Sequence, residues 1–256
     1  MSATVFVRHL ADSRRGLAGW AVGTALTAMA YAGTYPSQRA NTDSIPQALR
    51  DGLHIDATAA GYLNASVFGI LLPLLAMIYG VTTGTRALAG DEESGRLDLL
   101  LAHPLTRTRL ALERFAALAT GAFAIAGLVW LGLLTVRTSA ELTTVTPTEL
   151  LAQCLNLALL AVFFGALALG LGAALGRRTT VLVATAVTGV IAYMAGTFAT
   201  QLGADWLTAL SPFHYYIGGE PLRNGFQWGD ATVLALASAA LVAAGLHRFN
   251  RRGIDT

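Results

Sequence analysis

The residues with the clearest capacity for chemistry lie in one charged segment, 91–109, which joins two long apolar runs. The segment opens with Asp91, Glu92, Glu93, Ser94, Gly95 and Arg96. Its carboxylates can pair with arginines on a soluble partner protein, or they can simply keep a surface loop solvated. The charges alone leave both interpretations open.

A Leu-rich stretch follows the acids. Leu97, Leu100 and Leu101 occupy positions i, i+3 and i+4 and therefore share one face of a helical turn. An apolar face of this kind can dock in the groove of a partner. Pro104 ends the turn, and Thr106 is placed to cap the helix that follows. The pattern predicts a short helix within the loop.

Neutral polar side chains are spaced through the apolar runs. Gln153 and Asn156 share a helical face. Groups of this kind commonly form hydrogen bonds between membrane helices, which is the first interpretation. The second is a substrate path, whose candidates are Asn64, Phe68, Asn156, Tyr193, Thr197 and Gln201. We expect Pro73 to kink its helix and the ridge Ala168, Gly172 and Gly176 to allow close helix packing.

Patterns for catalysis and metal binding are not found. The five histidines are scattered, and Cys154 is the only cysteine, so neither a disulfide within the chain nor a Cys-based zinc site can form. All 17 basic residues are arginine, which excludes a Walker A loop because that loop needs a lysine. Carboxylates are almost absent from the span interiors, which argues against a proton- or sodium-coupled carrier. We expect this chain to bind no metal or cofactor.

The composition predicts an integral membrane protein. Hydrophobic residues make up 54% of the chain and charged residues 12%, with a mean hydropathy of +0.56. A bilayer core requires about 20 apolar residues of helix. Six stretches qualify, and we expect one all-α domain over 1–256 with spans at 16–35, 61–83, 110–136, 150–175, 179–202 and 231–246.

The arginines predict the orientation. Most of them flank alternate ends of the spans, as in 8–15, 86–114, 177–178 and 248–252, and the opposite loops hold more acids than arginines. The positive-inside rule then places both termini in the cytoplasm, in agreement with six spans. Phe6, Val7 and Leu10 share a face and predict an N-terminal interfacial helix. The aromatic-rich connection 203–229 predicts helical pieces that re-enter the outer leaflet.

The segment after the second span resembles the permease subunits of type-2 ABC exporters. Their pattern is an acid, Ser-Gly, a Leu-rich turn, Pro and then Arg, and the matching residues here are Glu93, Ser94, Gly95, Leu97, Leu99, Leu100, Leu101, Pro104 and Arg107. Arg96 stands where Thr is more usual, and Asp98 where Glu is. Leu210-Ser211-Pro212-Phe213-His214-Tyr215-Tyr216 also resembles the actinobacterial subgroup linked to export of polyketide antibiotics and other drugs.

The resemblance implies that the loop is a coupling helix seated on a separate ATPase subunit. Residues 92–97, 100, 101 and 104 would make that contact. Two ATPase copies would carry ATP and Mg, and a second permease, the same chain or a different one, would complete the transporter. The location would be the inner membrane of a bacterium, with no nucleic-acid partner.

The sequence therefore predicts a permease that exports an amphipathic antibiotic, drug or lipid. Two other functions stay open: a secondary carrier that needs no ATPase, and a membrane scaffold or sensor that transports nothing. A membrane-embedded enzyme is disfavoured because no paired catalytic residues are found.

Overall fold

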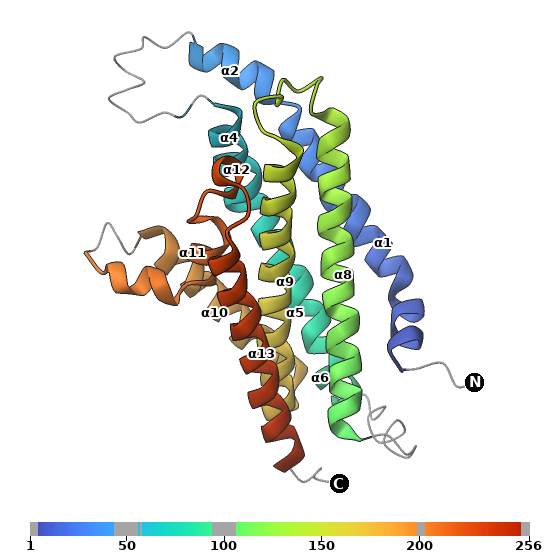
Figure 1. Cartoon of the computed structure of the whole chain (residues 1–256). Coiled ribbons are helices and arrows are strands. Elements are labelled where there is room, and N and C mark those ends of the chain that lie inside the picture. The colour runs from blue at the N-terminus through green and yellow to red at the C-terminus, as the bar shows by residue number, and fades with distance from the viewer. Residues whose placement is uncertain (1–4, 44–55, 57, 94–105, 199–202, 252–256) are drawn as a thin grey trace.

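The computed structural model describes residues 5–43, 56, 58–93, 106–198 and 203–251, and all regular structure within them is helical (Figure 1). Five of the described helices are long and apolar enough to cross a membrane. They comprise Ala59–Ala87, Thr108–Val136, Pro147–Leu175, Arg178–Phe198 and Trp228–Arg251. These helices correspond to the second through sixth predicted spans, and the protein is a multi-pass membrane protein.

The first predicted span differs from expectation. Helix α1 (Val5–Ala32) runs without interruption through the region expected to hold a separate interfacial helix. No proline or other strong helix breaker lies between the two parts, so the helix continues. Glycines and threonines in its second half lower its hydropathy below that of the five other helices. The span also ends before residue 35, because Tyr35 opens a new helix, α2 (Tyr35–Asp43).

The second span is built from three consecutive pieces: α4 (Ala59–Tyr62), the π-helix η1 (Leu63–Leu71) and α5 (Leu72–Ala87). Thr58 caps its start by accepting from the Gly61 N–H at 3.1 Å. Pro73 falls in the first turn of α5, where the wide π register ends. A π-helical segment therefore precedes Pro73, the position at which the sequence predicts a kink. After α5 the chain enters α6 (Ala89–Glu93).

The remaining long helices lie close to their predicted positions. They are α8 (Arg107–Val136), α9 (Pro147–Leu175), α10 (Arg178–Phe198) and α13 (Trp228–Arg251). Thr106 caps α8 through the Arg109 N–H at 3.3 Å, as predicted. Gly176 ends α9 at a φ of +67°, a left-handed conformation that favours glycine.

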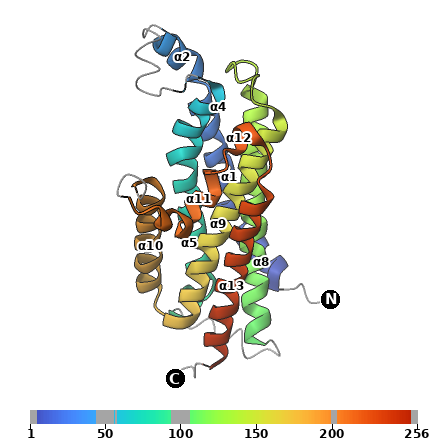
Figure 2. The ribbon, with the colours of Figure 1, turned by 60° about the vertical axis from the view of Figure 1, so that its left-hand side comes forward.

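Helix α9 forms the centre of the bundle, with α5, α8 and α13 packed around it (Figures 1 and 2). Its contact with α5 is made through small residues. A Cβ on Gly80 would lie 2.3 Å from the Ala161 carbonyl oxygen, and one on Gly84 would lie 2.9 Å from the Ala168 Cβ. The predicted small-residue ridge is thus a packing surface. Figure 2 shows α10 at the edge of the bundle.

The start of α1 and the end of α13 point toward the same end of the bundle (Figure 1). The arginines at 86, 109–114, 177–178 and 248–251 belong to helix ends on this side, and those at 14–15 lie in the first half of α1. Among the described residues, three short helices connect α10 to α13. These are η3 (Asp205–Leu210), α11 (Pro212–Ile217) and α12 (Pro221–Asn224). The end opposite the arginines carries α2 and α4, with α12 close to α4, whereas η3 and α11 lie beside α10 farther down the bundle (Figures 1 and 2).

Candidate functional site

The candidate site is the junction where α11 meets the π-helix and α9. Tyr216 of α11 is 1% exposed, and its hydroxyl donates to the Phe68 carbonyl of η1 at 2.9 Å. Burial holds the pKa of the Tyr216 phenol well above its ordinary value, so the hydroxyl remains a neutral donor. The bond ties a short helix late in the chain to the middle of the second span.

Pro73 explains why this carbonyl is free. In π register an N–H at position 73 would bond the Phe68 carbonyl, and in α register it would bond Gly69. Proline has no N–H. Tyr216 reaches the first carbonyl, and the Tyr193 hydroxyl of α10 donates to the Gly69 carbonyl at 3.4 Å. The missing N–H leaves one of these two carbonyls without its helix donor, and two tyrosines from later elements donate to the pair.

Helix α9 holds the other side of Tyr216. The Asn156 and Gln153 side-chain amides donate to its backbone carbonyl at 3.2 and 3.4 Å. Both side chains are buried, with exposed fractions of 2% and 0%. Because the two residues share one helical face, they meet the same carbonyl. Gln153 and Asn156 therefore form hydrogen bonds between helices, from α9 to α11, which is the first of the two interpretations given for this pair.

Aromatic rings close the space around these bonds. The Phe213 ring lies 5.2 Å from the Tyr193 ring, edge-on, and 5.7 Å from the Phe164 ring. Ser211 fixes the start of α11 by accepting from the Phe213 N–H at 3.2 Å and donating to the Ala192 carbonyl of α10 at 2.7 Å. The junction is therefore a packed and hydrogen-bonded contact among four elements.

The candidate path residues are only partly brought together. Phe68, Asn156 and Tyr193 meet at the junction. Asn64 lies on the same π-helix, and its buried side-chain oxygen has no hydrogen-bond partner among the described residues. Thr197 is exposed near the end of α10, and Gln201 lies outside the described residues.

The second candidate site is the acidic helix α6 at the other end of the bundle. Leu88 and Ala89 are fully buried, and Ala89 packs with Ala168 of α9 and Val181 of α10. The Arg114 side chain of α8, 5% exposed, donates to the Ala87 carbonyl just before this helix. Four spans therefore contact the short stretch that leads to the acids.

The predicted coupling residues lie mostly beyond this point. Glu92 and Glu93 end α6, and the Glu93 side chain is exposed. Ser94, Gly95, Arg96, Leu97, Leu100, Leu101 and Pro104 lie outside the described residues. The helix predicted from the leucine face therefore stays a prediction.

Sequence reasoning did not single out Tyr216 or the π-helix. Tyr216 stands in the aromatic-rich connection 203–229, whose composition predicts re-entrant helical pieces but no bond to a particular residue. The available signal was Pro73 in mid-span, since a missing N–H requires another donor for a buried carbonyl. Sequence alone does not say which distant hydroxyl supplies it.

Fold and sites together define an all-helical, multi-pass membrane protein. Within the described residues no group of three His, Cys, Asp or Glu side chains is placed to hold a metal ion. The model of one protein family, described as multidrug efflux system permease Rv1217c, C-terminal domain, matches residues 9–250, and the chain belongs to this family. A search of curated proteins finds no match. The family makes the chain a membrane permease of the exporter type, and it confirms the resemblance to exporter permeases.

Proposed function

We propose that this permease is one subunit of an ATP-driven exporter and that a separate ATPase supplies its energy. The family match supports the export function. Seventeen arginines and no lysine leave no phosphate-binding Walker A loop within these 256 residues. On this proposal ATP and Mg bind to two copies of the ATPase. Helix α1 also crosses the membrane, as the first span in the sequence, and brings the total to six.

The contacts of helix α6 support the proposal that this end of the bundle couples the ATPase to the membrane spans. The buried start of α6 touches α5, α9 and α10, and Arg114 links it to α8. A push on the acids at its exposed end is therefore transmitted to four spans at once, because packed helices move as units. We assign the contact with the ATPase to residues 92–97, 100, 101 and 104.

The Tyr216 junction is the proposed outer gate. Phe68 and Asn156 are fully buried beneath α11, so a substrate can reach them only when α11 moves away. Opening breaks the bonds of Tyr216 to Phe68, Asn156 and Gln153, each worth about 1 kcal/mol net. The unpartnered oxygen of Asn64 can then accept a hydrogen bond from an amphipathic substrate.

A second permease subunit is the proposed occupant of the exposed face of α10. This face carries large apolar side chains over its whole length: Val183, Val187, Val190, Ile191, Met194 and Phe198. Cys154 is the only cysteine in the sequence, so a Cys154→Ala chain offers a cysteine-free background. Val187→Cys in that background should form a cross-linked pair of permeases, while Leu236→Cys on α13 should not. Equal cross-linking at both positions would contradict the assignment.

The coupling proposal is tested by substitutions at the acidic segment. The tagged permease is purified from membranes of its own host, and Mg-dependent ATP hydrolysis and substrate efflux are measured. Glu93→Arg and Leu100→Asp should abolish transport-linked hydrolysis while the chain still inserts. Glu141→Arg is the matched control, since it reverses a charge at the opposite end and breaks only the exposed pair with Arg39. Efflux by the permease in the absence of any ATPase would identify a secondary carrier instead.

A further inference from the structure

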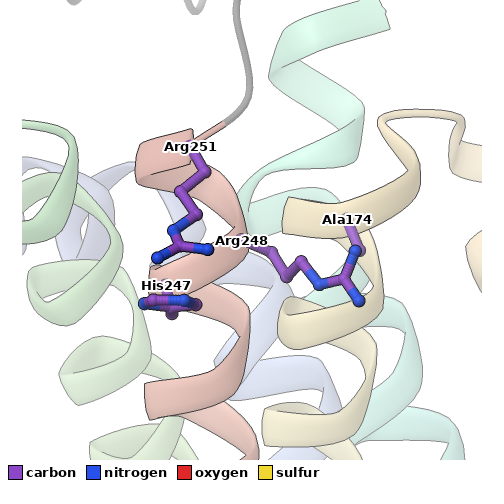
Figure 3. Close-up of a pocket in the computed structure, with 4 residues that line it drawn as sticks. All are labelled: Ala174, His247, Arg248 and Arg251. Carbon is purple, nitrogen blue, oxygen red and sulfur yellow. The ribbon is translucent and has the colours of Figure 1, made fainter.

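A basic pocket lies at the Arg-rich end of the bundle, between the last turns of α9 and α13. His247, Arg248 and Arg251 of α13 and Ala174 of α9 line a cavity of about 580 Å³. Figure 3 shows the Arg248 side chain extending from α13 toward Ala174, while the Arg251 guanidinium points toward His247. All three nitrogen-bearing side chains line the pocket, Arg248 on the side of α9 and Arg251 beside His247.

The pocket follows from the way the two helices cross. A Cβ on Gly245 would lie 2.6 Å from the Gly170 Cα, so the backbones of α13 and α9 are in direct contact there. One turn farther along α9, Ala174 presents only a methyl group to the gap. The space beyond the crossing is therefore left to the long side chains of α13.

The charges in the pocket are not neutralised by the rest of the described structure. Arg248 and Arg251 are exposed, and no ion pair joins either of them to a carboxylate of the described residues. Guanidinium groups donate to phosphate in a bidentate manner. A phosphate-bearing anion is the ligand chemistry that this arrangement fits.

The surface next to the pocket is apolar. Leu175, adjoining Ala174, is 42% exposed. Along α13, Val233 and Leu236 are exposed, as are the alanines at 240, 243 and 244. A headgroup in the pocket would therefore be continuous with acyl chains lying on α13. A free phosphate would gain nothing from this apolar surface.

We propose that the pocket is a binding site for an anionic phospholipid of the leaflet at the Arg-rich end. Arg248 and Arg251 bind the headgroup phosphate, His247 supplies a further donor, and the acyl chains contact α13. Basic pockets between membrane helices are suited to such headgroups. The site is independent of the proposed ATPase and can be tested without it.

Native mass spectrometry of the purified full chain tests the site. The protein is titrated with cardiolipin, phosphatidylglycerol or phosphatidylcholine carrying the same acyl chains. The wild type should retain the two anionic lipids and not the zwitterionic one. Arg248→Gln combined with Arg251→Gln should weaken retention by about tenfold or more. Arg248→Lys with Arg251→Lys should preserve most of it.

Arg177→Gln with Arg178→Gln is the matched control. It removes the same charge from the connection between α9 and α10, outside the pocket lining, and should leave lipid retention unchanged. Equal retention by wild type and the Arg248/Arg251 glutamine variant would overturn the proposal. So would displacement of the lipid by inorganic phosphate, which would indicate a free-anion site. Loss of a copurifying protein with lipid retention intact would identify a protein-docking surface instead.

Discussion

The hydroxyl of Tyr216 donates to the carbonyl of Phe68 at 2.9 Å, across 148 positions of the sequence. The acceptor is open because Pro73 supplies no N–H, and the donor is held in place because Asn156 and Gln153 bind the Tyr216 carbonyl. The bond thus depends on three further residues from two other helices, α5 and α9. This makes it the point where α11 can be either locked to the bundle or released.

Tyr216→Phe removes the hydroxyl and leaves the ring. The Phe68 carbonyl then loses a buried donor, which should destabilise the fold by about 1–3 kcal/mol. Thermal unfolding of the detergent-solubilised protein measures the change. Tyr215→Phe is the control, since its hydroxyl bonds only the Ala209 carbonyl beside it and is less buried. Equal melting temperatures of the two variants would refute the proposal that the Tyr216–Phe68 hydrogen bond holds α11 to the bundle.

Pro73→Ala restores an N–H at the position where the π-helix ends. That N–H can bond Phe68 in π register or Gly69 in α register, so the tyrosine hydroxyls become partly redundant. In the Pro73→Ala background, Tyr216→Phe should therefore cost about 1 kcal/mol less than in the wild type. Unfolding free energies of the four proteins give this coupling. Additive effects would show that Pro73 does not create the need for Tyr216.

Gly80→Ala should separate α5 from α9. The added Cβ would lie 2.3 Å from the Ala161 carbonyl oxygen, and both groups belong to helix backbones that cannot move independently. We expect a loss of about 1–3 kcal/mol and a lower yield of monodisperse protein. Gly127→Ala on α8 is the control, because no atom lies within 4 Å of its added Cβ. It should be neutral or slightly stabilising, since alanine favours helix over glycine. A Gly80→Ala chain as stable as this control would contradict the close contact.

Arg114→Gln should weaken transmission between α6 and the third span. The shorter side chain loses the bond to the Ala87 carbonyl, and coupled ATP hydrolysis should fall by about tenfold, equivalent to roughly 1.4 kcal/mol in the barrier. Arg109→Gln removes an exposed guanidinium from its i,i+4 pair with Glu113 and should have little effect. Hydrolysis and efflux are measured on the assembled transporter. If both variants lost the same share of activity, the loss would come from the removal of a positive charge. The bond from Arg114 to the Ala87 carbonyl would then have no specific role.

Much of the architecture is predictable because it depends on local composition. Long apolar runs give the second through sixth spans, and the end of α9 falls where Gly176 permits a left-handed cap. Thr106 is recognisable as a cap because its position before an apolar run is a local signal. The limits of α1 are not predictable in this way. The hydropathy of the sequence does not indicate that α1 continues through its polar start. It also does not indicate the turn that ends α1 before Tyr35.

The sequence by itself determined that this is a membrane protein, which end of the bundle is Arg-rich and where the acidic segment lies. Composition and helical periodicity carry that information, and both are local. Only the tertiary structure decided that residues 63–71 adopt the π register, that Tyr193 and Tyr216 reach the carbonyls of Gly69 and Phe68 before Pro73, and that Gly80 touches Ala161. A helix can hold buried open carbonyls only where another segment supplies the donors, so that choice belongs to the assembled bundle.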